Sequence, residues 1–136
     1  MYKHKVQYYE TDKMGITHHS NYIRWMEEAR VDFLRQIGWD FAKFESEGIN
    51  SPVVSLNCNY KLTTEFSDEI DIEVSVAEFK GVKLILSYKM YNKDGKLVCE
   101  ASSVHAFIDA NGRPIRLKKD FPEFYEVLTN LVVASE

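Results

Sequence analysis

The chain has 136 residues, of which 45% are apolar and 28% are charged, and 21 acidic against 17 basic side chains give a net charge of −4. This length suits a single domain over residues 1–136, and the composition excludes collagen, low-complexity disorder and a disulfide scaffold. The acidic balance argues against a partner that is nucleic acid or an anionic membrane, because both require a net basic surface. A small phosphate-bearing ligand held by a few local lysines stays compatible with it.

The sequence also predicts a compartment. Cys58 and Cys99 lie far apart and form no C-x-x-C pair, so two reduced thiols are the simpler interpretation. No run approaches the roughly 20 apolar residues of a membrane span. Residues 1–5 lead directly into an alternating pattern without an apolar signal region, so we expect a cytoplasmic protein.

The first elements are expected to be a strand, a loop and a long helix. Residues 2–9 alternate in polarity as a short strand does, and a loop follows over 10–17. Apolar residues then recur at helical spacing, which predicts a helix over 19–37 that Thr17 or Ser20 could cap and Gly38 would stop. A shorter helix is expected over 40–47.

The rest of the chain is expected to be mostly strand. The expected elements are strands over 54–62, 70–76, 82–90 and 97–108, and a terminal helix over 121–132. Tight turns between long strands predict an antiparallel sheet, whose apolar face the 19–37 helix must cover. The 97–108 strand has small or apolar residues on both faces, which is typical of a central strand.

This order predicts an α+β hotdog fold, a curved antiparallel β-sheet wrapped around one long central α-helix. The open strand edges of so small a sheet also predict that the chain forms at least a dimer.

Residues 8–30 hold the side chains that could take part in a reaction. Asp12 lies on the expected loop, Gly15 follows three residues later, and His18 and His19 stand where the helix begins. The N-terminus of a helix stabilises an oxyanion, and a nearby carboxylate can act as general base or nucleophile toward a carbonyl. This set suffices for hydrolysis of a thioester, because a thiolate with a parent pKa of roughly 8.5 leaves without a strong general acid.

The same segment resembles the motif of the 4-hydroxybenzoyl-CoA thioesterase family of hotdog acyl-CoA thioesterases. The motif residues are Tyr9, Asp12, Gly15, His19, Asn21, Tyr22 and Glu27. The resemblance implies hydrolysis of an acyl-CoA to free acid and CoA by a homodimer or homotetramer. An acyl carrier protein thioester could replace acyl-CoA, and neither a cofactor nor a metal is expected.

The resemblance also implies roles for individual residues. Asp12 matches the catalytic carboxylate, His19 matches a site histidine, and Glu27 matches an acidic helix position near the site. The amide groups around Thr17, His18 and His19 match the region that polarises the thioester carbonyl. The substrate-binding candidates are Gly15, Thr17, His18, Tyr22, Tyr60, Lys80 and Lys83, the two lysines by a weak match to positions that contact CoA phosphates. Tyr60 and Asp68 resemble a second motif, in which Thr63 replaces the usual proline.

Each candidate also has a purely structural interpretation. An Asp before a turn often only bonds nearby backbone, and Glu27 could simply pair with a basic side chain. The alternative functions are a non-catalytic acyl-CoA or acyl-carrier-protein binding module, which predicts binding without thiol release, and an oligomeric scaffold, which predicts neither. The identity of the acyl group and the choice between activated water and an acyl-enzyme anhydride stay open.

Overall fold

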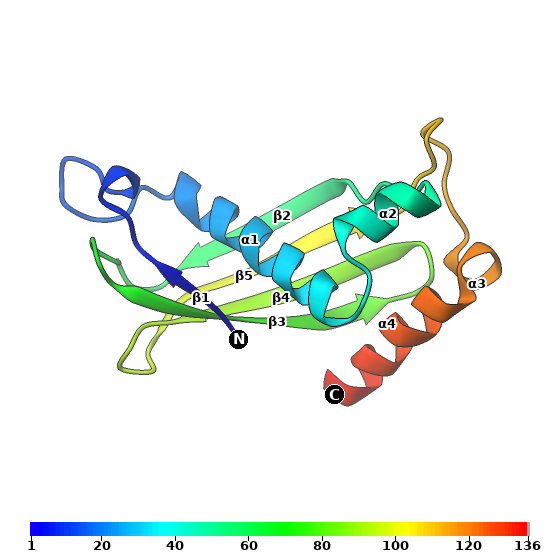
Figure 1. Cartoon of the computed structure of the whole chain (residues 1–136). Helices are drawn as coiled ribbons and strands as arrows, with labels where there is room; N and C mark the ends of the chain where they lie inside the picture. Colours follow the sequence, from blue (N-terminus) through cyan, green and yellow to red (C-terminus); the bar gives the residue numbers. More distant parts are fainter. Residues whose placement is uncertain (136) are drawn as a thin grey trace.

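Five strands form one antiparallel sheet with a long helix lying along it (Figure 1). The computed structural model describes residues 1–135, with side chains described for residues 1–132. The elements are β1 (Tyr2–Lys5), the 3-10 helix η1 (Tyr8–Glu10), α1 (Ser20–Gln36), α2 (Phe41–Glu47), β2 (Val53–Tyr60), β3 (Glu69–Phe79), β4 (Lys83–Tyr91), β5 (Leu97–Ala106), α3 (Leu117–Asp120) and α4 (Pro122–Ser135).

The sheet has the strand order β1-β3-β4-β5-β2. The consecutive strands β3, β4 and β5 pair as a meander, while β1 and β2 are the two edges. Cys99 pairs with both Met90 and Tyr60, which places the end of β2 beside the beginning of β5. The antiparallel sheet and the internal position of β5 are confirmed.

Helix α1 buries one face against the sheet because its apolar residues recur at helical spacing. Trp25 has no exposed surface, and Met26 is 3% exposed. The predicted stop is confirmed, since Gly38 has a φ of 84°, a left-handed conformation that Gly adopts without strain. The predicted capping was wrong: neither the Thr17 nor the Ser20 side chain caps the helix, and His18 Nδ1 accepts the Ser20 amide at 3.3 Å instead.

The first strand is shorter than the alternation predicted. It ends at Lys5, and residues 8–10 turn into η1. The cause is a tertiary contact, because the buried side chain of Glu10 turns inward and accepts a hydrogen bond from Trp25 Nε1 at 2.8 Å. The same carboxylate also caps η1 by accepting the Gln7 amide at 2.8 Å. An inward-facing carboxylate cannot belong to a regular strand whose polar side is exposed.

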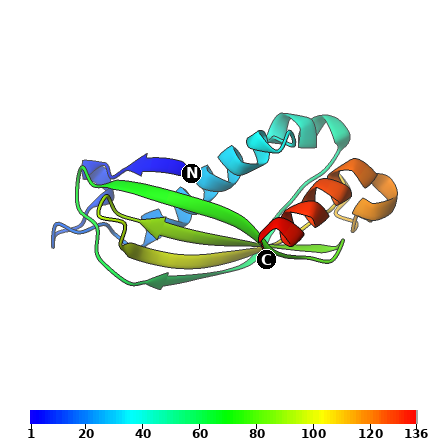
Figure 2. The same ribbon diagram turned by 90° about the horizontal axis from the view of Figure 1, so that it is seen from below.

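The terminal helix closes the far end of the core. Phe124 of α4 is fully buried, stacks on Trp39 with ring centroids 4.6 Å apart, and meets Phe44 and Phe107 edge-on. Figure 2, seen from below, shows α3 and α4 at the end of the sheet where α2 lies. The terminal helix was therefore predicted correctly, whereas the short α3 before it was not.

A single long helix along a curved antiparallel sheet is the hotdog architecture that the sequence predicted (Figure 1). None of the helices within residues 1–135 has both the length and the apolar character that a bilayer span requires.

Candidate active site

Residues 11–17 form a small hairpin that presents Asp12. Thr11 and Thr17 face each other in an antiparallel bridge, and the Asp12 amide donates to the Ile16 carbonyl at 2.9 Å. Gly15 donates its amide to the Asp12 carbonyl and has a φ of 80°. The loop 13–15 thus ends on a residue in the left-handed conformation, which is a common geometry for a three-residue hairpin loop. We call this segment the 11–17 hairpin.

One oxygen of the Asp12 carboxylate is held by a hydrogen bond. Oδ1 accepts the Met14 amide at 2.9 Å, which is the turn-forming contact that the structural interpretation anticipated. Within residues 1–132, no hydrogen bond reaches Oδ2. The side chain is therefore oriented by its own turn while one oxygen stays able to act on another molecule.

Three backbone amides at the start of α1 were expected to polarise a carbonyl, and the structure separates them. The Thr17 amide donates to the Thr64 carbonyl at 2.8 Å, and the His18 amide donates to the Glu10 carbonyl at 2.8 Å. These two amides are therefore occupied. Within the described part of the chain, the His19 amide has no hydrogen-bond partner. His19 thus offers the free N–H at the positive end of the α1 dipole.

A pocket of about 310 Å³ lies between the 11–17 hairpin, the first turn of α1 and the end of β2. Its lining residues are Asp12, Met14, Ile16, Thr17, His19, Tyr22, Tyr60, Lys61, Leu62 and Thr63. Five candidates thus share one cavity: Asp12, Thr17, His19 and Tyr22 from one short segment, and Tyr60 from the end of β2. The apolar members give it a surface suited to an acyl group beside the polar groups that would act on it.

Buried hydroxyl groups join the two walls of this pocket. Thr64 is 1% exposed, and its Oγ1 lies 3.0 Å from the Tyr22 hydroxyl and 2.6 Å from Thr17 Oγ1. The Tyr60 hydroxyl donates to the His19 carbonyl at 3.3 Å. Burial raises the pKa of Tyr22, so its phenol keeps its proton at neutral pH.

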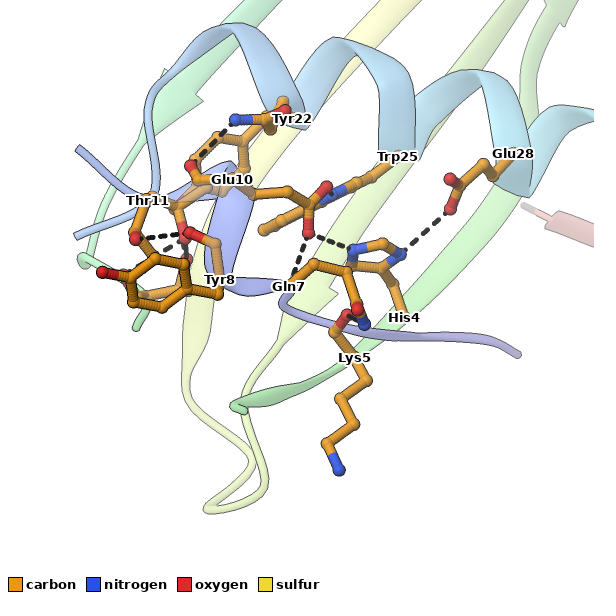
Figure 3. Close-up of polar contacts among 12 residues, drawn as sticks. His4, Lys5, Gln7, Tyr8, Glu10, Thr11, Tyr22, Trp25 and Glu28 are labelled. Carbon is orange, nitrogen blue, oxygen red and sulfur yellow. Dashed lines mark hydrogen bonds and ion pairs between the residues drawn. The ribbon is translucent and has the colours of Figure 1, made fainter. Parts of the chain in front are cut away.

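Beneath the hairpin, the carboxylate of Glu10 is the centre of a second polar cluster (Figure 3). Oε1 accepts the Gln7 amide and lies 2.8 Å from His4 Nε2, while Oε2 accepts Trp25 Nε1 at 2.8 Å. Burial raises the pKa of Glu10, but the hydrogen bonds from Gln7, His4 and Trp25 outweigh it, and the net pKa is lowered. The other ring nitrogen of His4, Nδ1, lies 3.0 Å from Glu28 Oε2, so the ring of His4 connects the two carboxylates.

Several candidate residues lie outside the pocket. Glu27 makes contacts of 2.7, 3.0 and 3.3 Å with Arg30 on the same helix, and it does not line the cavity. The His18 ring stacks on His19 and lies 2.9 Å from the Ser20 hydroxyl. Gly15 shapes the turn without lining the pocket.

The two lysines lie at the other end of the sheet. Lys80 and Lys83 flank the β3–β4 turn, which Figure 1 shows opposite the 11–17 hairpin. Lys80 pairs with Glu78 at 2.9 Å. Asp68 accepts the Glu65 amide in a turn and does not line the pocket. Within one chain, the two lysines and the pocket are therefore separate.

Sequence reasoning missed two buried residues that support the site. Glu10 stood at the first position of the expected loop, and Thr64 stood in a polar stretch after β2. Their partners are distant in sequence, so no local pattern identified them. The one signal in the sequence was the departure of Thr63 from the family motif, one residue before Thr64.

Asp12 and His19 line one pocket at the tip of the long helix in a hotdog sheet, which is the arrangement expected of an acyl-group hydrolase. Residues 6–130 match the model of the Thioesterase-like superfamily. The chain belongs to this superfamily, and the family resemblance predicted from its motif is confirmed.

Similar proteins have names consistent with this family. The Bacillus subtilis protein YneP, provisionally named an acyl-CoA thioesterase, is 34% identical over 122 residues, which cover 89% of this chain and 88% of that protein. The solved structure of a DHNA-CoA thioesterase from Staphylococcus aureus is 31% identical with a TM-score of 0.92, covering 98% of this chain and 91% of that one. A gentisyl-coenzyme A thioesterase structure, BH1999, is 25% identical with a TM-score of 0.84, covering 96% of this chain and all of that chain (100%). The hotdog fold is thus confirmed.

Proposed function

We propose that this chain hydrolyses the thioester of an acyl-CoA to the free acid and CoA. Asp12 acts as general base or nucleophile, and the His19 amide stabilises the developing oxyanion. The observation that carries the proposal is that the Asp12 carboxylate and the unoccupied His19 amide belong to residues lining one pocket. Membership of the Thioesterase-like superfamily and the names of the relatives support the substrate class.

The chemistry needs only groups in this pocket. In the general-base route, Asp12 takes a proton from water while the water oxygen attacks the thioester carbon. The carbonyl oxygen gains negative charge, which the His19 N–H and the α1 dipole stabilise. The carbon–sulfur bond then breaks, and the proton held by Asp12 passes to the departing thiolate. In the nucleophilic route, Asp12 Oδ2 attacks the carbon directly, CoA thiolate leaves, and water hydrolyses the anhydride.

Replacement of one carboxylate oxygen tests this assignment. Asp12→Asn keeps the acceptor for the Met14 amide but removes the base, so we expect kcat for acyl-CoA hydrolysis to fall about 100-fold, which corresponds to about 2.7 kcal/mol. The matched control is Asp109→Asn, because Asp109 accepts the Asn111 amide in a similar turn outside the pocket. Release of free thiol from a panel of acyl-CoA thioesters measures both.

The outcome also separates the alternative functions. Retention of more than about a tenth of wild-type kcat would count against Asp12 as the central group. Ligand binding by the wild-type chain without thiol release would indicate the binding module instead. A single turnover in ¹⁸O water distinguishes the routes, because only the anhydride route can leave solvent oxygen in Asp12.

We further propose that the enzyme is a homodimer joined through β2. Within residues 1–135 this strand pairs only with β5, and its apolar side chains are exposed: Val53 is 45%, Val54 57% and Leu56 41% exposed. An unpaired strand edge with exposed apolar residues is a surface that a second copy can cover. Because Tyr60 at the end of β2 lines the pocket, the partner would lie against the substrate-binding site.

A two-fold dimer through antiparallel β2 strands would bring opposite ends of the two sheets together. The partner's Lys80 and Lys83 would then approach the pocket end of this chain, where CoA phosphates could be held. We expect Lys80→Glu/Lys83→Glu to raise KM for acyl-CoA but not for an acyl thioester of N-acetylcysteamine, which lacks the nucleotide.

A mixture of two impaired variants tests whether these lysines act across the interface. One variant carries Asp12→Asn, and the other carries the two lysine substitutions. In a mixed dimer, one pocket combines an intact Asp12 with intact lysines of the partner, so low-KM activity should return on mixing. Absence of recovery despite formation of mixed dimers would contradict this arrangement.

A reducing compartment, and so the cytoplasm, is the proposed location. Its support is that Cys58 and Cys99 are both free thiols. Fractionation of the cells that produce the chain tests this location.

A further inference from the structure

We propose that Glu10 is a positioning residue for the reaction, which rests on the hydrolase function proposed above. Glu10 is not among the residues that line the pocket, so it does not meet the substrate directly. Its carboxylate joins β1 to α1, and its backbone carbonyl holds the end of the 11–17 hairpin. Through these contacts, Glu10 sets where Asp12 and the His19 amide lie.

The carboxylate of Glu10 connects three parts of the chain. His4 comes from β1, Gln7 precedes η1, and Trp25 is on the second turn of α1 (Figure 3). All three are donors to a side chain that is only 4% exposed. A buried carboxylate whose oxygens are all engaged holds its neighbours in one arrangement, because breaking any bond would leave a polar group unsatisfied away from water.

The backbone carbonyl of the same residue acts on the hairpin. It accepts the His18 amide at 2.8 Å and the Asn21 side-chain amide at 2.9 Å. Glu10 lies two residues before Asp12, and its carbonyl binds the residue just before His19. Glu10 therefore anchors the chain next to both the Asp12 carboxylate and the free His19 amide. Because the His18 amide is engaged by Glu10, the next amide, that of His19, is the one left to face a substrate oxygen.

Two acceptor oxygens are needed at position 10, and not only the shape of the side chain. Gln at position 10 would place an NH₂ group against donors, because both carboxylate oxygens now accept only N–H groups. Rotation of the Gln side chain would only move the conflict from Trp25 to Gln7 and His4. Glu10→Gln therefore loosens the cluster at constant volume, without creating a cavity.

The test compares Glu10→Gln with Glu28→Gln. Glu28 is the other carboxylate that contacts His4, but among residues 1–132 its hydrogen bonds go to Tyr2 and His4 and not to the hairpin. Glu28→Gln therefore controls for the loss of a His4 contact alone. We expect Glu10→Gln to lower kcat at least about tenfold with KM changed less than about threefold, and Glu28→Gln to keep kcat within about twofold of the wild type. An unchanged kcat in folded Glu10→Gln would overturn the proposal, as would an equal loss in both variants.

Amide hydrogen exchange provides a readout that does not depend on activity. In Glu10→Gln, the His18 amide should exchange at least about tenfold faster, while the Thr17 amide, bonded to Thr64, should change much less. Equal acceleration at both amides would indicate general destabilisation and overturn the proposal. If Glu10→Gln fails to fold, Trp25→Phe removes one donor and should show the same exchange pattern to a smaller extent. A wild-type chain without hydrolase activity would refute the proposed function, whereas the exchange pattern would still test the anchor.

Discussion

The Tyr22 hydroxyl on α1 lies 3.0 Å from the Thr64 hydroxyl in the segment after β2. This contact joins the helix that begins at the pocket to the segment that forms its opposite wall. Because Thr64 also bonds Thr17, one buried hydroxyl group links the hairpin, the helix and the strand end. The width of the pocket therefore depends on a side chain that does not line it.

Removal of these hydroxyls should give non-additive losses of stability. We expect Tyr22→Phe to lower the free energy of unfolding by about 1 kcal/mol and Thr64→Val by about 2 kcal/mol, because Thr64→Val leaves the buried Tyr22 hydroxyl without this partner. The double variant should lose less than the sum of the two changes. Urea unfolding of the four proteins measures the coupling, and additivity within about 0.3 kcal/mol would show that the two hydroxyls are independent.

A buried histidine predicts a loss of stability in weak acid. His105 is 1% exposed, its Nε2 lies 2.6 Å from the Ser103 hydroxyl, and no group among residues 1–132 bonds its Nδ1. Burial, with a smaller contribution from the nearby positive charge of Arg30, lowers the pKa of His105 from its ordinary value of 6.5 to about 4. Between these two pH values, the unfolded chain binds a proton that the folded chain excludes.

The free energy of unfolding should therefore be unaffected by His105 above about pH 6.5 and should fall as the pH decreases toward 4. At about pH 5 the expected loss is about 2 kcal/mol. His105→Gln removes this titration, so its stability should decline less between about pH 7.5 and pH 5. Parallel pH profiles for the two proteins would contradict the expectation.

Cys58 should be the more reactive of the two thiols. A hydrogen bond from the Cys99 thiol, which outweighs the effect of burial, lowers the pKa of Cys58 to about 7, while the same contact raises the pKa of Cys99. Iodoacetamide should therefore modify the half-buried Cys58 first, at a rate that increases through pH 7. Cys99→Ala should slow this reaction at neutral pH. Mass spectrometry identifies the site, and initial labelling of Cys99 would refute the assignment.

The turn of the 11–17 hairpin should tolerate Asn at position 15 but not Val. A Cβ at Gly15 would meet open space, so the cost comes from its φ of 80°, which a β-branched residue adopts with strain. We expect Gly15→Asn to retain at least about half of kcat and Gly15→Val to lose several-fold, because a shifted turn moves Asp12. Gly95→Val is the matched control: Gly95 has a φ of 76° in the β4–β5 turn, so this variant should lose stability without loss of kcat.

Much of the fold was predictable because its signals are local. The alternation in β3 and β4, the helical spacing of α1 and the glycine after it each depend on residues close together in the chain. The early end of β1 was not predictable, since it follows from a carboxylate that turns inward to meet Trp25, fifteen residues away. From polarity alone, an acidic side chain at this position is predicted to be exposed to solvent.

The candidate site likewise has residues that local sequence predicts and residues that it does not. Asp12, His19 and Tyr22 lie within one short segment, so their spacing in the sequence is enough to identify them. Thr64 acts across 42 residues of sequence, and the lysines lie where strand pairing places the β3–β4 turn. Long-range placement of this kind depends on the sheet as a whole.

The strand order has a consequence for how the protein is made. Both edge strands come from the first 60 residues, whereas their partners β3 and β5 lie later in the chain. As the chain leaves the ribosome from its N-terminus, the 11–17 hairpin and α1 emerge before the meander that they pack against. The sheet can be completed only after β5 has been synthesised, so the segment that carries Asp12 is translated early and acquires its final place late.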